Sequence, residues 1–266
     1  MTRAQNIQRD MIKKYRKQLW SPFVKAIKDY QLIEDGDTVM VAISGGKDSL
    51  LLAKLLEELT KHPLVDFNVK FIAMDPGYTA FNRHKLEENA KLLGIDLHIE
   101  SSDIFKILAH KAPESPCFLC ARMRRGALYG IAEKYGCNKI ALGHHYDDVI
   151  ETTLLNLFYA GSIKTMRPKL HSDNYKGISL IRPLYYVRED AIKKIMESNH
   201  IDPLDCACAV AADETASKRK DIKILIKTLK RQFGDIDKTI FNATQNINLD
   251  HVVGWEKDGV KYRFDD

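Results

Sequence analysis

Residues 44–49, with the sequence SGGKDS, constrain the fold of this chain more than any other stretch. An apolar run at 39–43 precedes them, and the leucine-rich run 50–56 that follows has the apolar density of a buried helix. The local prediction is a strand, a glycine turn and a helix. Two glycines let the backbone approach a bulky anion, and a helix start offers free N–H groups at the positive end of its dipole. With one lysine and two serines in addition, the stretch is predicted to bind phosphate rather than to be an ordinary tight turn.

Strand and helix segments alternate through the middle of the chain. Strands are expected at 38–43, 67–74, 95–100, 139–142 and 178–184, and helices at 47–60, 82–93, 102–110, 117–135, 147–159, 188–199, 215–233 and 235–248. Such alternation predicts an α/β fold with a doubly wound, mostly parallel sheet. Ligands of these sheets bind beyond the carboxyl ends of the strands. Residues 44–49, 75–78 and 143–145 all follow predicted strands, so one site can collect them.

Residues 3–30 have the pattern of a long amphipathic helix. Apolar side chains recur every three or four positions, at Ile7, Met11, Tyr15, Leu19, Phe23, Ile27 and Tyr30. Pro22 is expected to interrupt the helix, because proline costs roughly 3 kcal/mol in a helix interior. We expect this segment to pack on the core rather than to form an RNA-binding face. The expected division is an N-terminal extension at 1–34, the main domain at 35–210, and C-terminal helices with a charged tail at 211–266.

The composition excludes few function classes. Lysine and arginine number 41 against 36 acidic residues, a net charge of +5 that is compatible with nucleic acid without being diagnostic. The basic residues cluster at 13–17, 122–125 and 218–231, and each cluster taken alone is interpreted as a solvated helix face. No apolar stretch approaches the length that spans a bilayer, and the N-terminus has no apolar signal core. A cytoplasmic protein without a membrane partner is therefore expected.

The five cysteines predict a metal or redox site. Their number is odd and no secretory signal precedes them, which argues against a disulfide framework. They are Cys117, Cys120, Cys137, Cys206 and Cys208. Cys117 and Cys120 form a CxxC at a helix start, and a distant cysteine can complete their ligand set. Two metal interpretations stay open: three cysteines on an iron–sulfur cubane with one open iron, or four closing a structural zinc site. Cys137, between a helix and a strand, is expected to be structural.

The stretch 142–148, LGHHYDD, places two adjacent carboxylates after the fourth predicted strand. Asp147 and Asp148 could bind Mg²⁺ or orient a reacting group, and the alternative is that they cap the following helix. His144 and His145 are expected to shape a nucleotide pocket rather than to bind zinc.

Four stretches together resemble the tRNA 2-thiocytidine synthetase (tRNA cytidine 2-sulfurtransferase) family of the PP-loop ATP pyrophosphatase superfamily. They are SGGKDS at 44–49, CFLCARMRR at 117–125, GHHYDDVIETTLLNLFY at 143–159, and MRPKL at 166–170 leading to IRPL at 181–184. The resemblance runs from about residue 30 to the helix expected at 235–248. It implies the adenine nucleotide alpha-hydrolase-like fold of PP-loop enzymes. Related uridine thiolases share the first three stretches but usually carry zinc-binding cysteine pairs at the chain ends, which this sequence lacks.

The resemblance also implies a mechanism. ATP binds with Mg²⁺, the C2 oxygen of a tRNA cytidine, expected at position 32, attacks the α phosphate, and pyrophosphate leaves. Sulfur carried by a [4Fe-4S] cluster then replaces the oxygen, and AMP departs. The implied partners are tRNA, ATP and a sulfur donor such as a cysteine desulfurase. Because family members commonly act as dimers, a homodimer is implied as well.

The matched positions supply the candidate site residues. ATP binding is assigned to Ser44, Gly45, Gly46, Lys47, Asp48, Ser49, Asp75, Gly143, His144 and Asp147, and catalysis to Lys47, Asp48, Arg124 and Asp148. Lys47 would neutralise phosphate charge, Asp48 or Asp148 would serve the metal, and Arg124 would stabilise the adenylate or contact RNA.

Cys117 and Cys120 would be cluster ligands by the same analogy, but the third ligand is open. The family usually has a second CxxC followed by Gly-Ser-Gln, whereas this chain has DCACAV at 205–210. Cys208 is favoured because it lies closer to the basic helix that follows, and Cys206 is the alternative. The departure also leaves open a tRNA uridine 2-thiolase, or another PP-loop adenylating ligase with structural zinc. A non-catalytic RNA-binding or redox protein is disfavoured by the intact SGGKDS.

Overall fold

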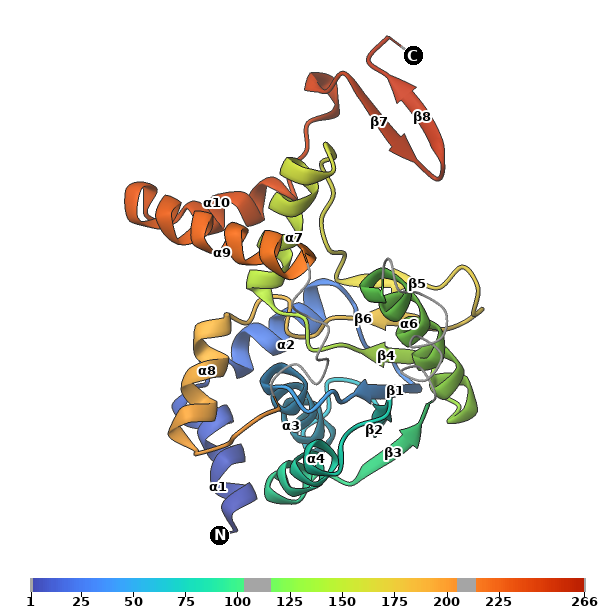
Figure 1. Cartoon of the computed structure of the whole chain (residues 1–266), viewed down its shortest axis with the longest axis vertical. Coiled ribbons are helices and arrows are strands. Elements are labelled where there is room, and N and C mark those ends of the chain that lie inside the picture. The colour runs from blue at the N-terminus through green and yellow to red at the C-terminus, as the bar shows by residue number, and fades with distance from the viewer. Residues whose placement is uncertain (1, 103–115, 205–213, 266) are drawn as a thin grey trace. The chain divides into compact units, whose positions relative to one another are not determined.

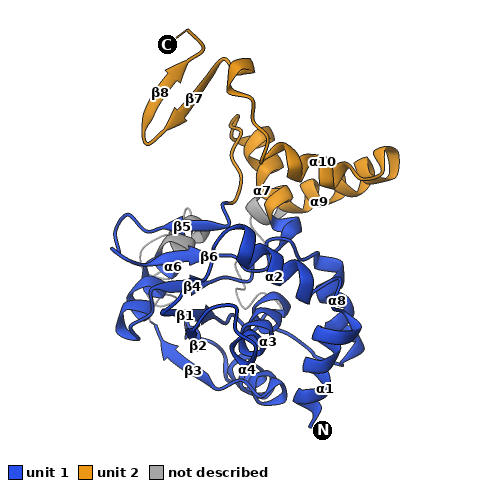
Figure 2. Ribbon diagram, turned by 180° about the vertical axis from the view of Figure 1, so that it is seen from behind, with its two compact units in different colours: residues 1–148, 167–217 blue, residues 149–166, 218–266 orange. Residues whose placement is uncertain are grey.

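The structure is a computed structural model that describes residues 2–102, 116–204 and 214–265, without the side chains of 116–122 and 214–217. The chain divides into two compact units (Figure 2). Unit 1 comprises residues 1–148 and 167–217, and unit 2 comprises residues 149–166 and 218–266. The helix expected at 102–110 lies outside the described residues except for its first position, and the three-part division expected above stays a prediction.

Unit 1 is built on a six-stranded sheet with the order β3-β2-β1-β4-β6-β5 (Figure 1). The strands are β1 (Asp37–Ala42), β2 (Phe67–Asp75), β3 (Leu97–Ser101), β4 (Lys139–Ala141), β5 (Lys169–His171) and β6 (Ser179–Ile181). All neighbours are parallel except β5, which is antiparallel to β6. The predicted α/β fold with a mostly parallel sheet is confirmed. The chain winds outward from β1 in one direction and from β4 in the other, so the switch point where such sheets bind ligands lies between β1 and β4.

Helices of unit 1 lie on both faces of this sheet. The unit contains α1 (Arg3–Arg9), the π-helix η1 (Asp10–Lys14), α2 (Trp20–Asp29), α3 (Lys47–Lys61), α4 (Ala80–Leu93), α6 (Pro116–Lys134), α8 (Glu189–Ser198) and the first residues of α7 (Tyr146–Tyr159), most of which belongs to unit 2. Val39 and Val41 of β1 join the core cluster that contains residues of α3, α4 and α8, whereas Met40 joins a second cluster with Tyr129 and Ala132 of α6. Because side chains alternate along a strand, the two clusters lie on opposite faces. Within the described ranges, no helix is long and apolar enough to cross a membrane.

Helix α3 carries the leucine-rich run that follows residues 44–49, the turn predicted to bind phosphate and called the phosphate-binding turn below. Ten of its fifteen residues are buried, among them every leucine. A helix that is apolar nearly all round belongs in a core. Packing on several sides therefore fixes the start of α3, and with it the turn that the sequence analysis singled out.

The N-terminal segment packs on the core, as expected. Ile7, Met11, Leu19, Phe23 and Ile27 are buried in the same cluster as α3, and the two tyrosines of the stripe pack against it. The expected break at Pro22 was wrong. Pro22 lies in the first turn of α2, where its missing N–H has no intrahelical partner to lose. The helix is interrupted instead by the π-helical turn η1 and the non-helical turn that follows it.

Two elements were not anticipated. Residues 160–177, for which no strand is expected, contain β5, which pairs with β6 so that Lys169 opposes Ile181 and the two RP-containing stretches lie side by side. The charged tail, for which no strand is expected either, contains the hairpin β7 (Gly254–Lys257) and β8 (Val260–Arg263). Its turn residues Asp258 and Gly259 have φ values of +53° and +78°. Asp-Gly between extended segments is a strong hairpin signal, but it is overlooked when the tail is judged only by its high content of charged residues.

Unit 2 is held by ion pairs as well as apolar contacts. It contains most of α7, α9 (Glu214–Phe233), α10 (Ile236–Ala243), η2 (Leu249–His251) and the hairpin. The buried carboxylate of Glu151 lies 3.2 Å from Arg219 Nε and 3.5 Å from Lys223 Nζ, and buried Asp237 pairs with Lys230 at 2.8 Å. Three basic residues of the cluster at 218–231 therefore form ion pairs within unit 2. Helix α10 ends at Ala243, five residues earlier than expected.

The N-terminal packing can be tested with Phe23→Ala. Phe23 is fully buried in unit 1. Truncating such a side chain leaves a cavity, so the free energy of unfolding should fall by about 3–5 kcal/mol. Urea unfolding measures the loss, with the exposed residue change Lys17→Ala as the control. Equal stabilities of the two variants would show that the segment is not part of the core in solution.

Candidate functional site

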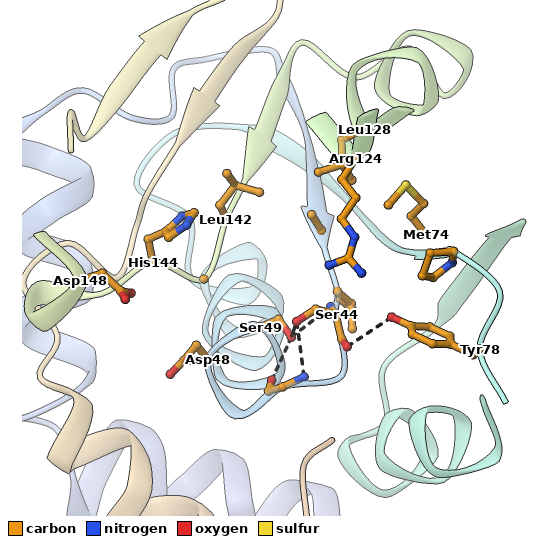
Figure 3. Close-up of a pocket in the computed structure, with 15 residues that line it drawn as sticks. Ser44, Asp48, Ser49, Met74, Tyr78, Arg124, Leu128, Leu142, His144 and Asp148 are labelled. Carbon is orange, nitrogen blue, oxygen red and sulfur yellow. Dashed lines mark hydrogen bonds between the residues drawn. The ribbon is translucent and has the colours of Figure 1, made fainter. Parts of the chain in front are cut away.

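A cavity of about 360 Å³ lies beyond the carboxyl ends of β1, β2 and β4 (Figure 3). Both polar and apolar residues line the cavity. They are Ala42, Ile43, Ser44, Gly46, Asp48, Ser49, Met74, Pro76, Tyr78, Arg124, Leu128, Leu142, Gly143, His144 and Asp148. The location is the switch point of the sheet. Three stretches that the sequence placed after separate strands therefore meet in one site, as predicted.

The phosphate-binding turn has the geometry expected of an anion site. Gly46 is the N-cap of α3, so the backbone leads straight into the helix start. The Ser49 hydroxyl donates to the Gly46 carbonyl at 2.9 Å and lies 3.2 Å from the Ser44 hydroxyl. The helix dipole places partial positive charge at this end. Figure 3 shows the Arg124 guanidinium extending from α6 toward these serines.

Gly45 is required by both its conformation and its surroundings. Its φ is +82°, a region that side chains disfavour, and a Cβ there would lie 2.5 Å from Leu204 Cδ1. The Leu204 N–H donates to the Gly45 carbonyl at 2.9 Å. The segment that ends at Leu204 is therefore fastened to the phosphate-binding turn. Sequence reasoning missed Leu204 because nothing in its neighbourhood indicates this contact.

The loop between β4 and α7 approaches the same turn from the other side. A Cβ on Gly143 would lie 2.9 Å from both the Asp48 carbonyl carbon and the Ser49 nitrogen. Next to it, the His145 N–H donates to Asp148 Oδ2 at 3.0 Å, and the Asp148 N–H donates to His145 Nδ1 at 3.4 Å. This reciprocal pair is a capping box for α7. Asp148 thus caps its helix and also lines the pocket.

Asp147 has a different structural role. Its Oδ2 accepts from the Glu189 N–H at 2.8 Å. Glu189 is the first residue of α8, and the N-cap residue Arg188 makes no side-chain capping bond. Asp147 therefore caps a second helix from a distance in sequence, and it is outside the pocket lining.

Lys47 lies between two carboxylates. Its Nζ is 3.0 Å from Asp48 Oδ2 and 3.2 Å from Glu189 Oε1. Burial lowers the pKa of Lys47, but the attraction of Asp48 and Glu189 outweighs it, so the pKa is raised from its ordinary value. The ammonium group stays charged at neutral pH. Glu189 was not among the predicted site residues, since an acidic residue in the first turn of a helix is common for capping reasons alone.

One carboxylate oxygen in the pocket is available to a ligand. Asp48 Oδ1 is buried and makes no hydrogen bond within the described part of the chain, with His145 Nε2 3.8 Å away. Asp48 and Asp148 both line the cavity, and hard carboxylate oxygens are the ligands that Mg²⁺ prefers. The donor chemistry therefore fits Mg²⁺. The described side chains contain no cluster of three or more acidic, histidine or cysteine residues that could hold a metal by itself.

Asp75 shapes the wall of the pocket rather than lining it. Its carboxylate accepts from the N–H groups of Gly77 at 2.8 Å and Tyr78 at 2.6 Å, and Arg83 Nη1 lies 3.2 Å away. The loop after β2 is fixed in this way, which sets Pro76 and Tyr78 against the cavity. The predicted ATP-binding role of Asp75 stays a prediction.

The metal-binding role of the four cysteines stays a prediction. Cys117 and Cys120 lie in the first turns of α6, but their side chains are outside the description, as are Cys206 and Cys208 altogether. Arg124 follows Cys120 by four residues, about 6 Å along the helix, and it lines the cavity. Cys137 is buried in the core on the α6 face, and burial raises the pKa of its thiol. An inert thiol there agrees with the structural role expected for it.

Of the predicted site residues, eight line the cavity: Ser44, Gly46, Asp48, Ser49, Arg124, Gly143, His144 and Asp148. Gly45, Lys47, Asp75 and Asp147 lie beside it through the bonds described above. Sequence reasoning missed the apolar lining from Met74, Leu128 and Leu142, although Leu128 stands one helical turn after Arg124.

Gly143→Ala tests the close approach of the two loops. Because the added methyl group would meet main-chain atoms, the loops must separate, at a cost of about 1–3 kcal/mol in the free energy of unfolding. Thermal unfolding and nucleotide titration should both show a loss. Gly130→Ala is the matched control, since that helical glycine has open space around it. Unchanged nucleotide affinity in Gly143→Ala would contradict this geometry.

Comparison with known proteins agrees with the motifs. The sequence model of the PP-loop domain family matches residues 13–205. The chain is 43% identical over 228 residues to the tRNA-cytidine(32) 2-sulfurtransferase of Geotalea uraniireducens, covering 84% of this chain and 88% of the relative. It is 38% identical over 238 residues to the protein of the same name from Pelobacter propionicus, covering 89% and 88%.

A solved structure supports the fold independently. The U34-tRNA thiolase NcsA from Methanococcus maripaludis, solved with its [4Fe-4S] cluster, superposes with a TM-score of 0.68 at 22% identity, over 85% of this chain and 76% of that one. At this identity the likeness concerns the fold alone. The motifs, the family match and the two relatives together place this chain in the tRNA-cytidine(32) 2-sulfurtransferase family of PP-loop proteins.

Proposed function

We propose that this protein is an ATP-dependent tRNA thiolase that exchanges the C2 oxygen of a cytidine, at position 32 of the tRNA, for sulfur. The main support is that one cavity is lined by the phosphate-binding turn, the carboxylates of Asp48 and Asp148, and Arg124. Arg124 belongs to α6, the helix that also contains the CxxC motif. The names of the relatives supply the nucleotide and its position.

In this proposal the cavity binds ATP. The start of α3 and the turn before it receive the phosphates, because they present N–H groups, a helix dipole and hydroxyl donors. Lys47, which stays protonated, neutralises phosphate charge. The apolar wall from Met74, Leu128 and Leu142 suits the adenine ring, whose faces are poorly hydrated.

The reaction is then a substitution in two steps. The C2 oxygen of the cytidine attacks the α phosphorus of ATP, a new P–O bond forms, and the bond to pyrophosphate breaks. A sulfide-level sulfur nucleophile, HS⁻, attacks C2 next, the C2–O bond breaks and the sulfur loses its proton, so AMP leaves with the oxygen that belonged to the base. Arg124, aimed at the phosphate-binding turn, stabilises the negative charge that develops at the α phosphate. Asp48 and Asp148 would hold Mg²⁺, which would neutralise charge on the triphosphate.

A [4Fe-4S] cluster would be held by Cys117, Cys120 and a third cysteine. Thiolate ligands suit such a cluster, and when bound it supplies the sulfur. Leu204, fastened to Gly45, precedes Cys206 by two residues and Cys208 by four, spans of at most about 7 and 14 Å of chain. The described chain therefore leads to the second cysteine pair from Leu204, a residue fixed at the phosphate-binding turn. This connection supports Cys206 as strongly as Cys208, so both remain candidates for the third ligand.

Partners follow from the chemistry. The reaction needs tRNA, ATP and a sulfur donor, for which a cysteine desulfurase is proposed, and it is expected in the cytoplasm. A homodimer remains a proposal drawn from the family.

Lys47→Met tests the ATP site. Losing a charge-assisted contact to the phosphates should slow tRNA-dependent AMP formation roughly 100-fold or more. Release of AMP and pyrophosphate measures this rate, and the surface change Lys176→Met is the control. A Lys47→Met enzyme as fast as the control would remove Lys47 from the mechanism.

Cys117→Ala tests the sulfur half of the reaction. It should abolish 2-thiocytidine in tRNA, measured by nucleoside mass spectrometry, whereas Cys137→Ala should retain it. Iron, sulfide and zinc analysis of anaerobically purified protein accompanies the assay. Intact thiolation by Cys117→Ala would overturn the proposal, and one zinc with no iron would favour a PP-loop ligase with structural zinc.

A further inference from the structure

We propose that Glu189 is a positioning residue for Lys47: together with Asp48 it holds the lysine ammonium beside the cavity before ATP arrives. The distance between the two side chains supports the contact itself, whereas the role of the contact in catalysis rests on the proposed function. Glu189 Oε1 lies 3.2 Å from Lys47 Nζ, and the Glu189 side chain is only 15% exposed.

Glu189 is itself fixed from several directions. Its N–H donates to Asp147 Oδ2 at 2.8 Å, and its second carboxylate oxygen lies 3.0 Å from Lys193 Nζ, one turn further along α8. The helix behind it is anchored by Ile192, Ile195 and Met196, which are buried in the core. The carboxylate is therefore a rigid reference point, in contrast to an acidic residue on a mobile loop.

Lys47 needs such a reference point. A lysine side chain carries about 2 kcal/mol of rotamer entropy, which must be lost when the ammonium group meets a phosphate. Its other partner, Asp48, lies next to it in sequence and lines the cavity, where the buried Oδ1 is open to a metal. With Glu189 present, the ammonium is held between two carboxylates, and Asp48 need not act as its sole counter-ion. An arriving triphosphate then meets an ammonium group that is already charged and held in one place by two carboxylates.

The alternative is a purely structural role, in which Glu189 only stabilises the start of α8. Acidic residues in a first helical turn interact favourably with the helix dipole. Asp190, the next residue, shares the same turn and charge but is exposed. Asp190→Asn is therefore the matched control for Glu189→Gln, because both remove one negative charge from the same helix end and only one removes the contact to Lys47.

The first measurement tests the contact between Glu189 and Lys47 and does not depend on catalysis. Nitrogen-15 NMR of the lysine ammonium groups, with the Lys47 signal assigned by its loss in Lys47→Arg, reports how fast those protons exchange with water. We expect exchange at least threefold faster in Glu189→Gln than in wild type, and no change in Asp190→Asn. Equal exchange in wild type and Glu189→Gln would overturn the contact.

The second measurement tests the role through a double-mutant cycle on tRNA-dependent AMP formation. Glu189→Gln should lower kcat about tenfold with less than a threefold change in KM for ATP. The same change made in Lys47→Met should have no further effect, because a residue that acts through Lys47 cannot act without it. If Glu189→Gln lowered kcat equally in wild type and in Lys47→Met, or if Asp190→Asn lowered kcat as much, Glu189 would have only a structural role. Wild-type protein that makes no AMP would refute the proposed function, while the exchange measurement would still decide the contact.

Discussion

Two close contacts at glycines beside the start of α3 determine where the neighbouring loops of the site can lie. On one side Gly143 comes so near the main chain of Asp48 and Ser49 that no side chain fits, and on the other Gly45 is covered by Leu204. The first contact locks the β4–α7 loop to the phosphate-binding turn. The second locks the segment leading to the cysteines at 206 and 208. Because α3 is buried, these contacts are made against an element that cannot shift to relieve them.

The charges around this rigid centre are balanced rather than simply positive. Lys47 stands between Asp48 and Glu189, and buried His145 stands among Asp48, Asp147 and Asp148 at 3.5 to 3.9 Å. The carboxylates also cap the helices α7 and α8. The same groups therefore set the geometry of the helix starts and the electrostatics of the cavity. Asp148 combines the two positions, because it caps α7 and also lines the cavity, whereas Asp147 caps α8 and lies outside the lining.

How far the sequence predicted this site depends on the range of each interaction. The strand, glycine turn and helix at 39–56 were predictable because each signal is local, and the parallel sheet followed from the alternation of elements. The apolar stripe from Ile7 to Tyr30 was predictable for the same reason. Glu189 and Leu204 were not, because each gains its meaning from one contact with residues more than 140 positions away in the chain. β5 was missed because three residues paired at a sheet edge leave almost no periodic signal.

The proposed reaction depends on activation of the cytidine C2 oxygen by the α phosphate of ATP bound in this cavity. The most direct measurement uses tRNA carrying oxygen-18 at C2 of cytidine 32, incubated with ATP and a sulfur source, followed by mass spectrometry of the AMP produced. The account predicts that each AMP formed together with 2-thiocytidine carries the heavy oxygen. Thiolated tRNA accompanied by unlabelled AMP would contradict it, since the oxygen would then have left the base by another route.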